Sequence, residues 1–263
     1  MTRRYKSPVF NPRSKKPFSI SRTKLELFLR CARCFYLNQR LGIKFKDESY
    51  YSLNHAIDRL IKEGADRLRL AEEFNPLAAK YGVRAIPFDD PDIKKWLNPF
   101  EGLRFHHQPT NLVLFGAPDD VWMILRDTKT SIDYTELAVI DAKATSSKKQ
   151  SVEESDFWES YKRQVEFYGW LLEKQDPPFA VSKTSYFIYA NTRPGQAYDN
   201  ASNLSLDFEL KLIPHLGNTD WIEPVVVAIK ECLMSGSLPQ ANNNCWICKY
   251  RARAAKIETK IRP

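Results

Sequence analysis

The sequence has few glycines and no long hydrophobic run. Only 9 of its 263 residues are glycine, whereas 13% are aromatic and 43% are hydrophobic, so a packed core is expected rather than a low-complexity chain. No apolar stretch approaches the length of a membrane span, and the basic N-terminus lacks the apolar segment of a secretory signal. We therefore expect a cytoplasmic protein without a membrane partner, whose cysteines stay reduced unless they bind a metal.

Acidic residues are absent from the first 24 positions, which contain eight Lys or Arg residues. Residues 249–263 carry six more basic residues and a single acid, Glu258. The rest of the chain has a net charge of −5, so the formal net charge of +8 comes from the two ends. Such ends either keep a chain soluble or contact the phosphates of a polyanion. A Gly-x-x-x-x-Gly-Lys loop is also absent, so any helicase or ATPase would be a separate partner.

The spacing of apolar residues predicts helices that alternate with strands. Thr23 and Glu26 fit a capping box at the start of the first helical pattern. Helical spacing covers residues 23–42, 51–72, 156–174 and 220–234. Short apolar runs between polar residues predict strands at 112–115, 121–125, 137–141, 184–190 and 204–213.

This order of elements predicts a mixed α/β domain over residues 19–252, whose sheet is flanked by helices. Within it, the proline-rich residues 73–111 are expected to form loops around one short helix near 93–97. A basic extended arm is expected over residues 1–18, and a basic tail over residues 253–263.

Two acids and a lysine accompany neighbouring predicted strands. Asp119 precedes one strand, and Asp141 and Lys143 lie at the end of the next. Residues two apart in a strand point to the same face, so Asp141 and Lys143 should project together, and a neighbouring strand could bring Asp119 alongside. Such a group on one sheet surface suits a divalent metal and an activated water. Asp120 competes with Asp119 for the first position.

Four short motifs occur in a fixed order along the chain. Residues 31–37 read Cys-Ala-Arg-Cys-Phe-Tyr-Leu, 116–119 read Gly-x-x-Asp, 141–143 read Asp-x-Lys, and 164–168 read Gln-x-x-x-Tyr. Over residues 19–252 this set resembles the PD-(D/E)XK nuclease superfamily, in its RecB-like and CRISPR-associated iron–sulfur exonuclease branch. The resemblance implies a restriction-endonuclease-like α/β core with a mixed central sheet flanked by helices. It favours Asp119 over Asp120, because Asp119 holds the Gly-x-x-Asp spacing.

The resemblance implies an enzyme that hydrolyses DNA phosphodiester bonds in repair, recombination or CRISPR-type processing. Asp119, Asp141 and the backbone carbonyl of Ala142 would bind Mg²⁺ or Mn²⁺. Lys143 would orient or deprotonate the attacking water. The expected partners are DNA and a separate helicase, repair or CRISPR protein. The remaining site residues, which share a helical face and would contact the scissile strand, are Gln164 and Tyr168.

Related nucleases often place a further metal ligand on an early helix. His55 is the candidate on the helix predicted over 51–72, and a structural role is its alternative. Glu63 and Asp66 are substitutes on the same helix. The two histidines of the loop-rich region, His106 and His107, are expected at the surface.

Four of the five cysteines form two Cys-x-x-Cys pairs, Cys31 with Cys34 and Cys245 with Cys248. Four such thiolates suit a [4Fe–4S] cluster or Zn²⁺. The resemblance implies that they join the N- and C-terminal segments, an arrangement that we name the cysteine clasp. Relatives commonly use one N-terminal and three C-terminal cysteines, which leaves the metal open, and four buried thiols are the alternative. Cys232 is expected in the core.

Two other classes of function stay open at this point. One is a non-catalytic module that binds nucleic acid and retains the nuclease-like fold together with a structural metal cluster. The other is an interaction protein in which the cysteine clasp is only structural. The combination of Asp119, Asp141, Lys143 and Gln164 favours the enzyme.

Overall fold

A computed structural model describes residues 8–45, 52–127, 132–145, 152–192 and 207–261 of the chain. The chain divides into two compact units. The first contains Met1–Glu48, His106–Leu114 and Asp220–Pro263. The second contains Ser49–Phe105 and Phe115–Thr219, so the domain predicted over residues 19–252 includes parts of both. Across the described residues, no helix combines the length and the apolar character that crossing a membrane requires.

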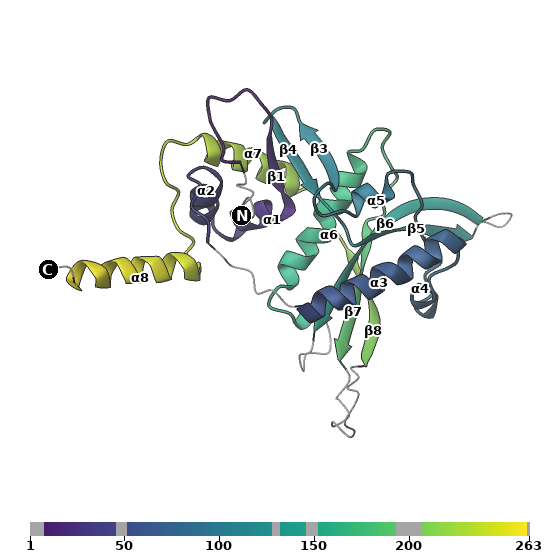
Figure 1. The fold of residues 1–263 in the computed structure, drawn as a ribbon. Helices are drawn as coiled ribbons and strands as arrows, with labels where there is room; N and C mark the ends of the chain where they lie inside the picture. Colours follow the sequence, from purple (N-terminus) through teal and green to yellow (C-terminus); the bar gives the residue numbers. More distant parts are fainter. Residues whose placement is uncertain (1–7, 46–51, 128–131, 146–151, 193–206, 262–263) are drawn as a thin grey trace, which may run out of the picture. The chain divides into compact units, whose positions relative to one another are not determined.

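The second unit is built around a five-stranded mixed sheet (Figure 1). Its strands in spatial order are β2 (Ala85–Pro87), β5 (Asp120–Asp127), β6 (Ile132–Thr145), β7 (Thr184–Thr192) and β8 (Phe208–Leu216). The pair β6 and β7 is parallel, while the other neighbours are antiparallel. A parallel pair needs a crossover connection, and helix α6 (Trp158–Glu173) lies in the segment between these two strands.

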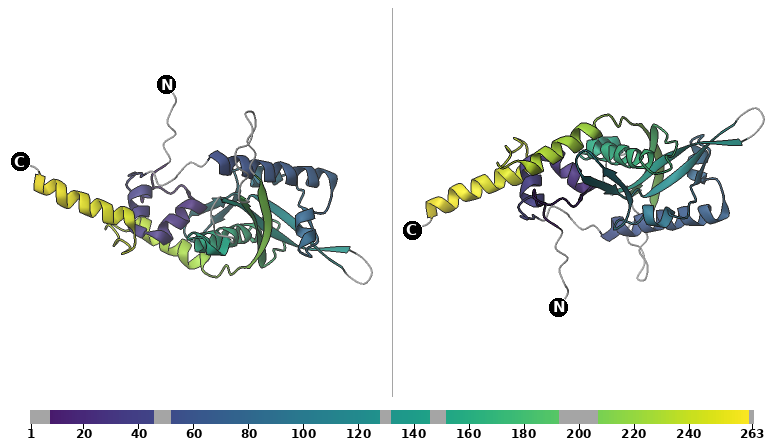
Figure 2. Two further views of the ribbon diagram at one scale, coloured as in Figure 1. Left: turned by 90° about the horizontal axis from the view of Figure 1, so that it is seen from below. Right: turned by 90° about the horizontal axis from the view of Figure 1, so that it is seen from above.

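Helices cover both faces of this sheet, as the two views of Figure 2 show. Helix α3 (Ser52–Ala71) packs against β6 and β2, and α6 packs against β6 and β7. Successive residues of a strand face opposite sides of the sheet. Accordingly, Ile140 joins a buried cluster against which Ile61 of α3 packs, whereas Asp141 bonds to Gln164 of α6. The alternation along β6 thus separates an apolar face from a polar one.

The region predicted as loops around one helix contains more regular structure than expected. The predicted short helix is present as α5 (Ile93–Trp96). The additional elements are α4 (Pro76–Lys80), β2 and β3 (Leu103–His107). Strands β2 and β3 have 3 and 5 residues, which is too short for a clear alternating pattern among the prolines.

Gly102 allows two backbone segments to approach closely next to the start of β5. Its φ angle is +63°, and a Cβ atom there would lie 2.5 Å from the carbonyl oxygen of Gly116. Only glycine accommodates both the left-handed conformation and this contact. This close approach lies at the end of β4 (Leu112–Gly116), three positions before Asp119.

The first unit contains four helices of the described chain and part of a small sheet. The helices are α1 (Arg22–Arg30), α2 (Ala32–Gln39), α7 (Ile222–Met234) and α8 (Trp246–Ile261). Strand β1 (Phe18–Ser21) belongs to a three-stranded sheet of order β1–β4–β3. Helix α1 packs against α2 and α7, and the buried side chains of these helices include Leu25, Phe35 and Ile229.

The single helix predicted over residues 23–42 is divided at Cys31. This residue has an extended backbone, with φ −166° and ψ 106°, and it separates α1 from α2. Helix α1 is capped by Ser21, whose hydroxyl accepts a hydrogen bond from the N–H of Lys24, so the predicted cap at Thr23 was wrong. Because the apolar periodicity continues through Cys31, the sequence pattern could not reveal the break between the two helices.

Several side chains differ in exposure from the expectation. In the predicted arm, Phe10 is buried and its ring centroid lies 5.3 Å from that of Phe18. His107 is buried rather than on the surface, and its Nε2 lies 2.8 Å from Oε2 of Glu223. Cys232 on α7 is only half-buried.

Candidate functional site

Asp119 is held against strand β6 by a hydrogen bond from the backbone. Strands β5 and β6 are antiparallel, and Asp120 pairs with Ile140. The next residues along this ladder are Asp119 and Asp141. Oδ2 of Asp119 accepts a hydrogen bond of 2.8 Å from the N–H of Ala142. Two parts of the chain that the sequence separates by about twenty residues are thereby joined.

The carboxylate of Asp141 is fully buried between Lys143 and Gln164. Its Oδ1 accepts a hydrogen bond of 2.8 Å from Nε2 of Gln164, and its Oδ2 forms an ion pair with Nζ of Lys143. Nε2 of Gln164 also lies 3.4 Å from the hydroxyl oxygen of Tyr168. The structure therefore brings Asp141, Lys143, Gln164 and Tyr168 together, and the hydrogen bond from the N–H of Ala142 joins Asp119 to the same stretch of β6.

Helix α3 adds two residues that the sequence analysis missed, Asp58 and Lys62. Nζ of Lys62 lies 3.0 Å from Oδ1 of Asp119 and 3.1 Å from Oδ2 of Asp58. His55, Asp58 and Lys62 are three and four positions apart and so share one helical face. The alignment of Asp58 and Lys62 with the candidate ligand His55 on one face of the helix is the signal that could have identified them.

The charges of this group influence one another. Burial, followed by the negative charge of Asp119, raises the pKa of Asp58, while Lys62 and Lys143 oppose this shift. Burial lowers the pKa of Lys62, but Asp119 and Asp58 outweigh it and raise the pKa overall. Lys62 is therefore a stable cation between two carboxylates.

The other metal ligands suggested on α3 have different surroundings. His55 is exposed and lies one turn before Asp58. Glu63 pairs with Arg59 at 3.7 Å, and Asp66 pairs with Arg69. In the described part of α3, Lys62 is the residue that pairs with Asp119, and it also pairs with Asp58.

Asp120, the alternative to Asp119, has a structural environment. It is buried, it forms an ion pair with Arg69, and it accepts hydrogen bonds from the N–H of Val121 at 2.9 Å and Nε1 of Trp122 at 3.0 Å. Burial raises the pKa of Asp120 to about 6, although Arg69 and these donors oppose the rise. Its carboxylate thus serves to hold α3 and β5 together.

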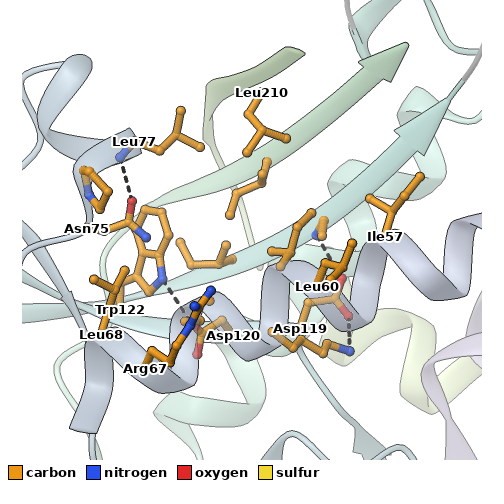
Figure 3. Close-up of a pocket in the computed structure, with 18 of the residues that line it drawn as sticks. Ile57, Leu60, Arg67, Leu68, Asn75, Leu77, Asp119, Asp120, Trp122 and Leu210 are labelled. Atoms are coloured by element: carbon orange, nitrogen blue, oxygen red, sulfur yellow. Dashed lines mark hydrogen bonds and ion pairs between the residues drawn. The ribbon is translucent and has the colours of Figure 1, made fainter. Parts of the chain in front are cut away.

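An apolar pocket of about 790 Å³ lies between α3 and the sheet of the second unit, with Asp119 and Asp120 among its lining residues (Figure 3). Its other lining side chains include Ile57, Leu60, Leu68, Trp122 and Leu210. The carboxylate of Asp119 therefore adjoins both an apolar cavity and the polar group around Asp141.

The cysteine clasp is present in the first unit. Cys31, Cys34, Cys245 and Cys248 are all buried, and their four sulfur atoms lie within 4.8 Å of one another. Sγ of Cys34 lies 3.6 Å from Sγ of Cys245 and 3.6 Å from Sγ of Cys248. The extended backbone at Cys31 sets the start of α2, which carries Cys34 in its first turn, and N- and C-terminal segments meet here. Such a group could bind a metal ion or cluster.

The cysteine thiols influence the pKa values of one another. Burial opposes the ionisation of Cys31, but the N–H groups of Asn242 and Cys34, together with two neighbouring thiols, lower its pKa to about 7. Burial and the other thiols raise the pKa of Cys34 far above its usual value. A bound cation would favour the thiolate form of all four side chains, because metal ligands must be deprotonated.

Comparison of the chain with models of known protein families and with curated proteins gives no match. The function of the chain must therefore be inferred from the two side-chain groups described above and from the resemblance of its motifs.

We expect Asp120→Ala and Asp119→Ala to differ sharply in stability. Removal of the Asp120 carboxylate leaves Arg69, the N–H of Val121 and Nε1 of Trp122 without this acceptor in a buried site, which should cost about 3 kcal/mol or more. Asp119 and its partner Lys62 are partly exposed, so Asp119→Ala should cost about 1 kcal/mol. Urea unfolding of both variants measures the difference, and equal losses would contradict the separate roles.

Proposed function

We propose that the protein is a metal-dependent deoxyribonuclease of the PD-(D/E)XK type. The observation that carries this proposal is the 2.8 Å hydrogen bond from the N–H of Ala142 to Asp119, because it joins the Gly-x-x-Asp and Asp-x-Lys motifs. The contact between Gln164 and Asp141 supports it further, since it adds the Gln-x-x-x-Tyr helix to the same group. The biological process and any helicase, repair or CRISPR partner remain predictions.

The donor set fits a hard divalent cation. Asp119, Asp141 and Asp58 offer carboxylate oxygens, and the backbone carbonyl of Ala142 follows Asp141 directly. Mg²⁺ and Mn²⁺ prefer such oxygens. The three carboxylates exceed the charges of Lys62 and Lys143 by one, which leaves the group a net attraction for a cation. When bound, the metal would polarise a phosphoryl oxygen and lower the pKa of a coordinated water.

The residues of the chain then have separate roles. Lys143 would orient the water and stabilise negative charge on the phosphoryl group. Nζ of Lys143 lies 4.7 Å from the centroid of the Tyr161 ring, which limits the positions of the ammonium group. Gln164 fixes the buried carboxylate of Asp141 and, with Tyr168, borders the site on α6. In this proposal Asp58, rather than His55, is the metal ligand that α3 contributes.

A non-catalytic nucleic-acid-binding module is the second candidate. It is favoured by one observation, namely that Lys62 and Lys143 already neutralise Asp119 and Asp141 by direct ion pairs. If these pairs are permanent, the carboxylates serve the stability of the unit and the chain binds nucleic acid without cutting it.

For the cysteine clasp we propose Zn²⁺, the alternative to the [4Fe–4S] cluster. Four thiolates around Zn²⁺ at about 2.3 Å lie about 3.8 Å apart at the corners of a tetrahedron. Three Sγ–Sγ distances of 3.6 Å and 3.8 Å agree with this edge, and all four sulfur atoms lie within 4.8 Å of one another. A [4Fe–4S] cluster instead places four iron atoms between its cysteine thiolates, which would require these side chains to separate.

We expect the wild-type protein to cleave labelled DNA in the presence of Mn²⁺ or Mg²⁺, and Asp141→Asn and Lys143→Met each to lower the rate at least about 100-fold. Asp92→Asn and Lys95→Met are matched controls, because they disrupt an exposed ion pair on α5 and should leave the rate unchanged. Gel analysis of single- and double-stranded substrates measures this. Equal rates in all variants would refute the site, and retention of DNA without cleavage would favour the binding module.

Lys62→Met should tighten Mn²⁺ binding on the order of tenfold, because it removes the cation that lies 3.0 Å from Oδ1 of Asp119. Calorimetric titration of the variant, with Lys95→Met as the control, gives the comparison. Unchanged or weaker binding would show that Lys62 and the metal do not compete for Asp119.

Protein isolated without oxygen should contain about one Zn²⁺ per chain and no visible absorption band. Cys34→Ser should lose the metal, whereas Cys232→Ser should retain it, because Cys232 lies outside the cysteine clasp. Elemental analysis and an absorption spectrum decide the matter. A brown protein with iron and sulfide would contradict Zn²⁺, and a stable protein free of any metal would contradict the clasp as a metal site.

A further inference from the structure

Helix α8 of the first unit, which is yellow in Figure 1, exposes large apolar side chains to solvent. From Lys249 to Lys260 no side chain is buried, and only Ala254 is half-buried. Trp246, Tyr250 and Ile257 are 59%, 68% and 47% exposed. A helix of 16 residues that packs so little has marginal stability in water. The exposed apolar side chains therefore indicate a surface that meets a partner.

The partner surface of α8 consists of two stripes that lie side by side. Positions separated by three, four, seven or eleven residues share a helical face. The basic stripe contains Lys249, Arg253, Lys256 and Lys260, and the apolar stripe contains Trp246, Tyr250 and Ile257. Arg253 follows Tyr250 by three positions and precedes Ile257 by four, so the stripes are adjacent. Arg251 and Glu258 point to the other side of the helix.

We propose that these two stripes of α8 form a binding surface for single-stranded nucleic acid. The basic stripe would contact successive phosphates, whose charge it complements. Exposed bases of a single strand can stack on Trp246 and Tyr250, and the neighbouring Arg253 adds cation–π attraction. In duplex DNA the bases are stacked on one another, so the aromatic residues have no such partner there.

An anionic lipid surface fits α8 less well. Membrane-surface helices carry a broad apolar face rich in large side chains. On α8 the apolar stripe has three large residues, two of which end in a polar group, and the remaining positions include exposed Ala252, Ala255 and Thr259. The narrow stripe of aromatic residues beside a row of cations corresponds better to a nucleic-acid strand.

The cysteine clasp fixes the end of α8 where this surface begins. Cys245 precedes the helix, Cys248 lies in its first turn, and both are buried. Trp246 and Lys249, the first residues of the two stripes, therefore start from an anchored turn. The side-chain amide of Asn242 donates a hydrogen bond of 3.1 Å to the carbonyl of Arg30, which supports the same segment. This inference concerns binding alone and does not depend on hydrolysis by the second unit.

The test measures fluorescence anisotropy of labelled oligo-dT with the full chain and no added divalent cation. Arg253→Gln should weaken binding about threefold to tenfold and reduce the slope of log affinity against log salt by about 0.7, the value of one single-strand phosphate contact. Tyr250→Ala should weaken binding about tenfold with the salt slope unchanged, because stacking is lost rather than charge. Arg251→Gln is the matched control on the same helix and should change affinity less than twofold.

Each variant should have the melting temperature and the metal content of the wild type. If Arg253→Gln differs from the wild type in either quantity, Lys256→Gln tests the basic stripe in its place. Equal losses for Arg253→Gln and Arg251→Gln would overturn the stripe in favour of diffuse charge. Unchanged oligo-dT binding in all variants would overturn the surface. Loss of binding to phosphatidylserine vesicles without loss of oligo-dT binding would identify a membrane instead. The anisotropy test measures binding and not cleavage. If the protein binds through α8 here but fails to cleave DNA in the separate assay with Mn²⁺ or Mg²⁺, only the proposed nuclease is refuted.

Discussion

A carboxylate that is fully removed from water must be compensated by donors or cations, and Asp141 imposes this constraint on the second unit. Lys143 satisfies one oxygen because it lies two positions further along the same strand face. Gln164 satisfies the other because the parallel pairing of β6 and β7 requires a crossover, which delivers α6 to this face. The geometry of the candidate site is thus a consequence of burying one charge beside a parallel strand pair.

The same electrostatic requirement explains why the adjacent residues Asp119 and Asp120 have different ion-pair partners and different exposure to solvent. Asp120 faces Arg69 and Trp122 in the interior, where its charge holds α3 to β5. Asp119 lies one residue earlier, outside the strand, and is partly exposed. It shares Lys62 with Asp58. A change of one position along the chain therefore separates a buried carboxylate from a partly exposed one, which is the one that the proposed nuclease uses.

The sequence could predict the elements whose patterns are long. The amphipathic helices at α3, α6 and α7 and the apolar runs of β5, β6 and β7 are present, and the four cysteines are together. It could not predict the extended residue Cys31, because the apolar periodicity of α1 continues into α2. Asp58 and Lys62 were also missed, since charged residues on a helix are usually solvated and only the tertiary contact with Asp119 distinguishes these two. Strands as short as β2 contain too few residues for a period of two.

The order of the cysteines along the chain has a further consequence, which concerns the unfolded state. Cys34 and Cys245 are the inner members of the cysteine clasp, and the whole of the second unit, Ser49–Phe105 and Phe115–Thr219, lies between them in the sequence. A metal bound there would close a loop that contains every residue of the candidate active site. By the entropy of loop closure, such a link restricts the unfolded chain by about 5 kcal/mol, as a disulfide across a long loop does. The second unit would then unfold as a tethered loop with its ends held together, and it would refold from a chain whose two ends have already been brought into proximity.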